Sequence, residues 1–254
     1  MTPNQQLRHR SVCFRVTRYC NARCGFCLAP SDGSHPSSQI LTQRIDWLLD
    51  RGVHAIHFCG GEPTIHPALP RLLEYVSERG GNAKLTTNGI EMPDALLQAL
   101  RESETEVKVS LHGNREQHNA ITGCDAFDRA TTNLQRLVAA GVPASVQTTV
   151  VKNAEWVVDW LASYCLKSGI RRLSVLPFIP RGEGLARRAE YELADADRRR
   201  LKEHVAMKRR VFGGRLDIRW LDFNGQTVPT VEADGRVILE GLTESTDQLL
   251  CRIP

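Results

Sequence analysis

Short apolar or alternating segments are separated along this chain by longer segments with apolar residues at helical spacing. The predicted strands cover residues 11–17, 53–58, 84–87, 106–111, 145–151 and 173–178. The predicted helices cover residues 40–49, 68–78, 93–101, 127–140, 156–167 and 195–210. Six strands that alternate with six helices predict right-handed crossovers and a parallel sheet.

The length of the repeating part limits the architecture. A complete eight-unit barrel needs about 250 residues for its units alone, whereas the units here end near residue 212. The pattern therefore predicts an α/β fold with a partial (β/α)6 TIM-like barrel over residues 1–212. Residues 213–254 contain further strand patterns at 215–223, 227–232 and 236–239, with a turn at Asp234-Gly235. We expect them to form a short β-rich C-terminal extension that closes the open bottom or side of the barrel.

Composition narrows the class of protein. The chain has 254 residues, 41% of them hydrophobic, and a net charge of +4. This charge predicts no nucleic-acid partner, although an anionic substrate would be tolerated. Residues 1–10 are polar and do not resemble a signal peptide, and no run approaches the roughly 18 apolar residues of a membrane span. We expect a soluble, cytoplasmic protein without a membrane partner.

Three of the eight cysteines, Cys20, Cys24 and Cys27, lie within eight residues. Structural zinc sites and ordinary ferredoxin clusters take four protein ligands. Three thiolates on a four-iron cluster would leave one iron open for chemistry. The remaining cysteines are scattered singly and form no CxxC pair; of these, Cys13, Cys59, Cys124 and Cys165 are read as small buried residues.

Special residues also follow the predicted strands. Gly60-Gly61-Glu62-Pro63 follows the second strand, Thr86-Thr87-Asn88-Gly89 ends the third, and Ser110-Leu111-His112-Gly113 ends the fourth. In parallel βα barrels functional groups gather at the carboxyl ends of strands. The cysteine loop and these segments are therefore expected at one end of the barrel.

Taken together, the CxxxCxxC loop and the Gly-Gly-Glu-Pro segment resemble the radical S-adenosylmethionine (SAM) superfamily, over about residues 11–180. The string from Ser110 through His118, Thr122-Gly123 and Phe127 resembles its SPASM and molybdenum-cofactor-synthase branch. The resemblance implies a [4Fe-4S] cluster on Cys20, Cys24 and Cys27, with SAM on its open iron. By the same resemblance, the SAM-binding residues would be Phe26, Gly60, Gly61, Glu62, Pro63, Thr87, Asn88 and Ser110.

The resemblance implies an enzyme. An electron from an external donor such as flavodoxin or ferredoxin passes through the cluster, cleaves SAM and yields a 5′-deoxyadenosyl radical, which removes hydrogen from a substrate. Candidate substrate-binding residues follow the fourth and sixth strands; they are His112, Arg115, His118, Arg181 and Glu183. The arginine-rich helix 195–210 is read as a solvated face.

One departure from the branch concerns auxiliary clusters, because residues 181–254 contain a single cysteine, Cys251. Functions that rely on auxiliary clusters are therefore not expected. The leading hypothesis is a small-molecule enzyme acting on a sugar, nucleoside or natural-product intermediate, with Cys251 as a hydrogen donor in an epimerisation. A peptide-modifying maturase is the alternative enzyme, and a non-catalytic iron–sulfur or zinc protein is the alternative of another class.

Overall fold

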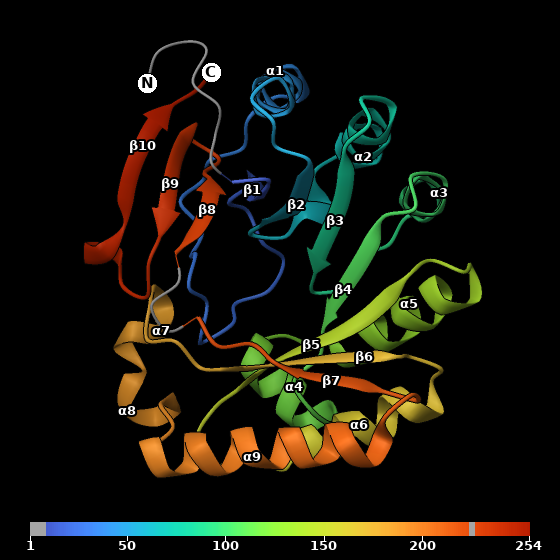
Figure 1. The fold of residues 1–254 in the computed structure, drawn as a ribbon, viewed down its shortest axis with the longest axis vertical. Coiled ribbons are helices and arrows are strands. Elements are labelled where there is room, and N and C mark those ends of the chain that lie inside the picture. Colours follow the sequence, from blue (N-terminus) through green and yellow to red (C-terminus); the bar gives the residue numbers. More distant parts are fainter. Residues whose placement is uncertain (1–8, 224–226) are drawn as a thin grey trace.

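The computed structural model describes residues 9–223 and 227–254, and its strands belong to a single twisted sheet (Figure 1). The sheet has ten strands in the order β10-β9-β8-β1-β2-β3-β4-β5-β6-β7. They are β1 (Ser11–Thr17), β2 (Ala55–Gly60), β3 (Asn82–Thr87), β4 (Glu106–Ser110), β5 (Ala144–Val150), β6 (Arg172–Pro177), β7 (Asp217–Trp220), β8 (Val228–Val231), β9 (Arg236–Glu240) and β10 (Gln248–Arg252). Strands β1 to β7 pair in parallel in sequence order.

Helices follow the strands of the parallel run. They are α1 (Ser38–Leu49), α2 (Leu69–Glu78), α3 (Asp94–Glu102), α4 (Arg115–Thr122), α5 (Phe127–Ala139), α6 (Val157–Lys167), α7 (Glu183–Ala186), α8 (Arg188–Tyr191) and α9 (Asp195–Phe212). Two short 3-10 helices, Pro63–Ile65 and Glu244–Thr246, complete the described elements. The predicted α/β partial barrel is confirmed, and it is not closed, since β10 and β7 are the edges of the described sheet.

Alternating burial explains how the sheet presents two different faces. Phe14 on β1 and Phe58 on β2 are fully buried toward the helix layer, with ring centroids 5.7 Å apart. The residues beside them in sequence, such as Arg15 and Cys59, point to the opposite, concave face. The interior of the barrel is therefore lined by polar side chains and thiols.

The C-terminal residues differ from the expected hairpin extension. Segment 215–223 was predicted as part of that extension, but β7 pairs in parallel with β6 after the long crossover helix α9. Strands β8 to β10 form antiparallel hairpins at the opposite edge, where β8 pairs in parallel with β1. Residues 213–254 thus contribute to both edges of the sheet, and the domain division at residue 212 remains a prediction.

Several described elements were absent from the predicted pattern, of which α4 and β10 are the longest. Residues 115–122 were expected as a loop but form α4, which begins after an Asn114 cap and ends at Gly123 with φ 66°. Residues 248–252 form β10, whose pattern of mostly exposed residues gives no periodic signal. The expectation for the polar N-terminus concerns mainly residues 1–8, which lie outside the described residues.

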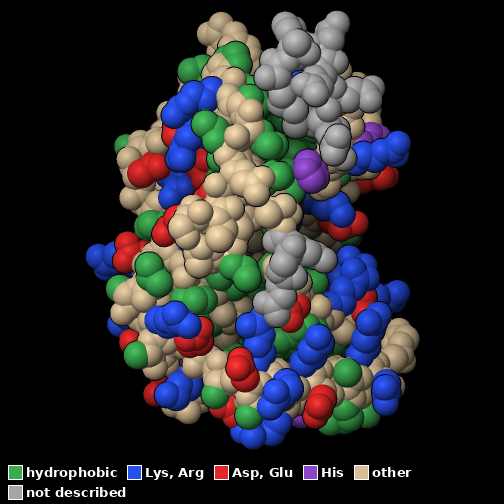
Figure 2. All heavy atoms as spheres, turned by 60° about the vertical axis from the view of Figure 1, so that its left-hand side comes forward, with side chains coloured by type: hydrophobic (Ala, Val, Ile, Leu, Met, Phe, Trp, Pro, Cys, Tyr) green, Lys and Arg blue, Asp and Glu red, His purple; other side chains and the backbone are tan. Residues whose placement is uncertain are grey.

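Helix α9 carries its charges on the outer surface. Leu201 and Val205 are buried, whereas Arg199, Arg200 and Arg210 are exposed. Figure 2 shows Lys and Arg side chains gathered over the lower part of the molecule, where α9 lies. Among the described helices, none has the length and apolar content needed to span a bilayer.

Candidate active site

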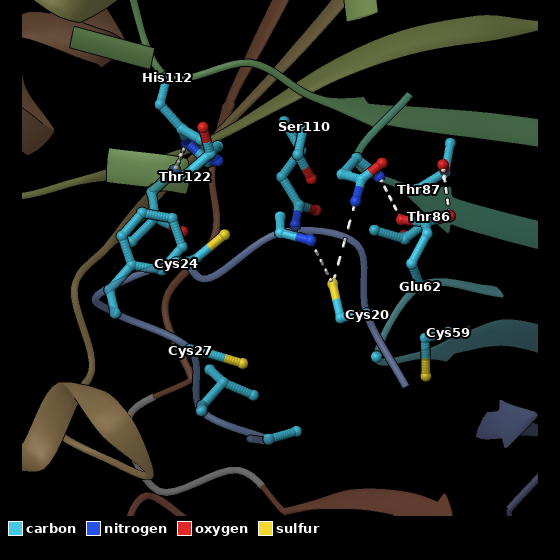
Figure 3. Close-up of a pocket in the computed structure, with 18 of the residues that line it drawn as sticks. Cys20, Cys24, Cys27, Cys59, Glu62, Thr86, Thr87, Ser110, His112 and Thr122 are labelled. Carbon is cyan, nitrogen blue, oxygen red and sulfur yellow. Dashed lines mark hydrogen bonds between the residues drawn. The ribbon is translucent and has the colours of Figure 1, made fainter. Parts of the chain in front are cut away.

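The cysteine loop between β1 and α1 opens onto a cavity of about 250 Å³ at the carboxyl ends of the strands. Cys20, Cys24 and Cys27 line this cavity, and Figure 3 shows their sulfur atoms around one hollow. The strand ends opposite contribute residues of β2 to β6; they include Cys59, Gly60, Gly61, Glu62, Thr86, Thr87, Asn88, Ser110, Gln147, Thr149 and Pro177. The structure thus brings together segments that are more than 150 residues apart in sequence.

Gly60 and Gly61 allow β2 to pack directly against the start of the cysteine loop. The Gly61 amide donates to the Thr17 carbonyl over 2.8 Å, and the Glu62 amide donates to the Tyr19 carbonyl over 2.7 Å. A Cβ atom on Gly61 would lie 2.0 Å from the Tyr19 carbonyl oxygen, and Gly60 has φ 142°. Only glycine meets both demands. These glycines therefore position the cysteine loop as well as lining the cavity.

Two further segments hold the loop from the other side. The amide of Arg23 donates to the Thr122 carbonyl over 2.8 Å, which anchors the loop to the end of α4. The amide of Glu183 donates to the Cys27 carbonyl over 2.9 Å. The loop carries little regular structure of its own, so its shape is set by these tertiary hydrogen bonds.

Glu62 is the buried centre of a hydrogen-bonded network that lines the cavity with the cysteines. Its members are Glu62, Thr64, Thr87 and Asn88, and we call this network the Glu62 shelf. Its Oε1 atom accepts from the Thr64 amide (3.0 Å), the Thr64 hydroxyl (2.8 Å) and the Thr87 hydroxyl (2.7 Å), and its Oε2 atom accepts from the Asn88 amide (2.7 Å). Burial raises the pKa of Glu62, and these four donors oppose that shift. The network joins the ends of β2 and β3 and leaves Oε2 with one protein donor.

His112 and His118 form a neutral pair beside Phe26. Amide N–H groups donate to Nδ1 of each ring, from Thr149 to His112 (3.3 Å) and from His112 to His118 (3.2 Å). Both protons must then sit on Nε2. Burial lowers the pKa of His112 to about 3 and that of His118 to about 4, so the rings stay uncharged. Phe26 packs its ring edge on His112 with centroids 4.9 Å apart.

A second cavity of about 530 Å³ lies on the other side of the loop, and Leu28 lines both. Arg181 lines this cavity, where its guanidinium binds Asp247 over 2.7 Å. Arg18 connects the same region to the loop, donating to the Pro30 carbonyl and to Glu232, the latter over 3.0 Å. A buried ion pair therefore binds Glu232 to Arg18 at the start of the cysteine loop, and Arg18 in turn holds the Pro30 carbonyl at the other end of the loop.

The family model described as "Radical SAM superfamily" matches residues 14–159, which include the cysteine loop and the ends of β2 to β5. The chain belongs to the radical SAM superfamily. Superfamily members use a [4Fe-4S] cluster and SAM, as the sequence predicted.

Curated relatives span several chemistries. The chain is 33% identical to Fe-coproporphyrin III synthase of Methanosarcina barkeri over 147 residues, 56% of this chain and 37% of the synthase. It is 33% identical to mycofactocin maturase MftC of Mycobacterium tuberculosis over 54% of this chain and 36% of the maturase. It is 36% identical to GTP 3′,8-cyclase of Chlorobaculum tepidum over 49% of this chain and 39% of the cyclase. The chain spans less than two fifths of the length of these three relatives.

Solved structures agree on the fold. Streptococcus suis SuiB bound to precursor peptide SuiA superposes with a TM-score of 0.77 and 19% identity, over 90% of this chain and 58% of SuiB. Native anSMEcpe with bound AdoMet superposes with a TM-score of 0.77 and 20% identity, over 95% of this chain and 77% of anSMEcpe. At these identities the likeness concerns the fold alone.

The residues present fit the radical SAM cluster. Three soft thiol ligands line one cavity, and thiolates are the ligands that iron–sulfur clusters take. In the described part of the chain, no three His, Cys, Asp or Glu side chains converge closely enough for a single metal ion; a four-iron cluster instead places its thiolates on separate irons. Burial raises the pKa of Cys20 to about 11 and of Cys24 to about 12, so cluster binding must release their protons.

The structure places the other predicted site residues in two groups. Those that line the first cavity are Phe26, Gly60, Gly61, Glu62, Thr87, Asn88, Ser110, His112 and His118. Those outside it are Pro63, Arg115, Arg181, Glu183 and Cys251. Pro63 begins a buried 3-10 helix, Arg115 is exposed on α4 and paired with Asp128, and the Glu183 side chain is exposed.

Cys251 lies on the helix side of the sheet. It pairs with Val237 of β9, which is fully buried in the helix-side core, and it packs against that core. Cys59, read from sequence as a small buried residue, lines the first cavity and lies next to Cys13 of β1. That contact and burial raise the pKa of Cys59, so it keeps its proton. Its position at a strand end, directly before Gly60, was the signal that could have identified it.

Proposed function

We propose that this chain cleaves SAM reductively and uses the resulting radical to remove hydrogen from a small organic substrate. The observation that carries the proposal is the convergence of Cys20, Cys24 and Cys27 with the Glu62 shelf on one cavity. The cluster, when bound, supplies one electron from an external donor such as flavodoxin or ferredoxin. The chain contributes ligands, orientation and exclusion of water.

The shelf supplies the groups that would hold SAM. Glu62 Oε2 accepts one hydrogen bond from the protein and can accept another from the amino group of the methionine portion. Gly60 and Gly61 line the same cavity and, without side chains, would let the backbone approach the amino group. Ser110 and Asn88 would offer neutral polar groups for the ribose and carboxylate. Phe26 would place its backbone beside the adenine.

His112 would act as a hydrogen-bond donor rather than as an acid or base. Its Nδ1 atom is held by the Thr149 amide, which leaves the Nε2 proton for an acceptor. Because its pKa lies near 3, this donor keeps one form across the physiological range. A substrate carbonyl, hydroxyl or ring nitrogen is a suitable acceptor.

A redox-neutral outcome such as epimerisation requires hydrogen to return to the substrate. Cys251 faces away from the cavity, whereas the Cys59 thiol lines it. Transfer of a hydrogen atom from Cys59 would form the substrate C–H bond and leave a thiyl radical. One electron from the external donor and one proton from solvent would then restore the thiol.

A peptide-modifying activity is the second candidate. It is favoured by the match to the maturase MftC and by the fold shared with SuiB, which was solved with a precursor peptide. A peptide substrate would enter the same cavity as an extended segment. Product analysis on candidate peptides and on small molecules would separate the two.

The experiment that tests the proposal uses anaerobically reconstituted protein with SAM and dithionite. We expect iron and sulfide to bind, and 5′-deoxyadenosine to form as measured by mass spectrometry. Cys24→Ala should lose both, whereas Cys165→Ala, a change in buried α6 away from the cavity, should keep both. Failure of the unmutated chain to bind iron would refute the proposal.

A further inference from the structure

The second cavity has the composition of an anion-binding site. Five arginines and three carboxylates line it; they are Arg15, Arg18, Arg181, Arg236, Arg252, Glu232, Glu244 and Asp247. Arginine binds carboxylate and phosphate through paired N–H donors. An arginine can hold a ligand here only where its guanidinium is not already paired with a carboxylate.

Three of these arginines, Arg15, Arg18 and Arg181, are buried, and each is paired with acidic side chains. Arg15 binds Glu232 and Glu240, the latter over 2.7 Å. Arg18 binds the other Glu232 oxygen over 3.0 Å. These pairs compensate charges that would otherwise be costly to bury. Arg15 and Arg18 form the buried floor of the cavity. Because they already bind carboxylates of the chain, we do not expect them to bind a ligand.

Arg181 is the partial exception on the floor. Its terminal nitrogens bind Asp247, but its Nε atom is buried without a hydrogen bond. That Nε lies 3.3 Å from Glu240, close enough for an ion pair but without hydrogen-bond alignment. Arg181 is 6% exposed, so this N–H points from a buried position in the cavity wall.

The rim carries the unmatched charge. Arg236 of β9 and Arg252 of β10 are directly opposite in the antiparallel register, and both line the cavity. Like charges directly opposite each other on neighbouring strands are destabilising. Arg236 pairs with Asp234 over 2.7 Å, whereas Arg252 has no ion pair among the described residues. Glu244, which also lines the cavity, accepts a hydrogen bond from the Gly182 amide. Arg252 is therefore the lining cation that no described ion pair neutralises.

We propose that this cavity binds an anionic group of the substrate, a carboxylate or a phosphate, between Arg236 and Arg252. An anion there would offset the repulsion between the two arginines. Because Leu28 lines both cavities, a substrate anchored at the rim can reach past it toward the cysteine loop. The assignment to a substrate rests on the proposed function, whereas anion binding does not depend on turnover.

The test is arginine footprinting of the SAM-loaded, reconstituted enzyme with phenylglyoxal, read by mass spectrometry. We expect inorganic phosphate or succinate to protect Arg236 and Arg252 from modification. The exposed Arg210 on α9 lies outside the cavity lining and should be modified equally with and without these anions. Preference for phosphate or for succinate distinguishes the two kinds of substrate group. Protection of neither arginine would overturn the proposal.

The anion affinity of a substituted protein provides a second test. Arg252→Gln should weaken binding of the preferred anion about tenfold or more, because a charged hydrogen-bond partner is lost. Arg210→Gln is the matched control and should leave anion binding unchanged. Unchanged affinity in Arg252→Gln would overturn the site. Iron content and 5′-deoxyadenosine formation, measured on the same preparations, show separately whether the proposed function itself holds.

Discussion

The Thr87 hydroxyl donates a 2.7 Å hydrogen bond to Glu62 Oε1, and so joins the end of β3 to the end of β2. Two backbone amides complete the arrangement, from Thr64 to Oε1 and from Asn88 to Oε2. These backbone N–H groups can only donate hydrogen bonds. Both oxygens of the side chain must therefore be acceptors, which only a carboxylate provides.

Glu62→Gln tests this requirement. Whichever way the new amide is turned, its NH₂ group faces a backbone N–H, so we expect a loss of about 1–3 kcal/mol in the free energy of unfolding. The cluster-free chain can be measured by urea denaturation. Glu78→Gln on the exposed surface of α2 is the control. Equal midpoints for the two variants would show that the shelf does not depend on the carboxylate.

Gly61→Ala should disturb the cysteine loop, since the new Cβ would lie 2.0 Å from the Tyr19 carbonyl oxygen. We expect lower iron and sulfide content per chain after reconstitution. Gly213→Ala is the control, because its Cβ would meet backbone oxygens no closer than 3.4 Å. Normal iron loading in Gly61→Ala would mean that the loop reaches its shape without this close approach.

The Arg181–Asp247 ion pair should influence the cluster through the backbone. Asp247 holds Arg181, and Glu183, two residues later, donates its amide to the Cys27 carbonyl. We expect Asp247→Asn to speed iron loss to a chelator, monitored by the visible absorbance of the cluster. Asn retains a hydrogen-bond acceptor for the arginine, so any effect of the substitution comes mainly from loss of the negative charge.

The matched control for that experiment is Glu192→Gln, which breaks the exposed Arg188–Glu192 pair on α8. An exposed pair contributes little, so chelator resistance should match the unmutated chain. If Asp247→Asn and Glu192→Gln behave alike, the Arg181–Asp247 ion pair does not position the cluster loop.

The two buried histidines predict how stability depends on pH. Their pKa values of about 3 and about 4 lie below the ordinary value of 6.5. Below pH 6.5 the unfolded chain therefore binds protons that the folded chain does not, and stability falls as the pH decreases from 6.5 toward 4. His112→Gln should make this fall shallower in urea denaturation of the cluster-free chain. An unchanged slope would show that His112 is not neutral when folded.

The sequence alone determined the elements whose signals are local. Alternating apolar residues defined β1, and helical spacing defined α2 and α6, because burial of one face is written into the order of residues. The CxxxCxxC loop and Gly60-Gly61-Glu62-Pro63 identified the radical SAM superfamily for a similar reason. Cofactor chemistry requires particular residue types at fixed spacing.

Only the tertiary structure decided the contacts between distant segments. Cys251 and Cys59 are both single cysteines in sequence, yet strand register directs one to the helix layer and the other into the cavity. Arg181, predicted to bind substrate, lines the second cavity and there binds Asp247 on the C-terminal hairpin, a partner that the sequence did not indicate. Side-chain direction and long-range ion pairing depend on which strands become neighbours, and that is settled by packing of the whole chain.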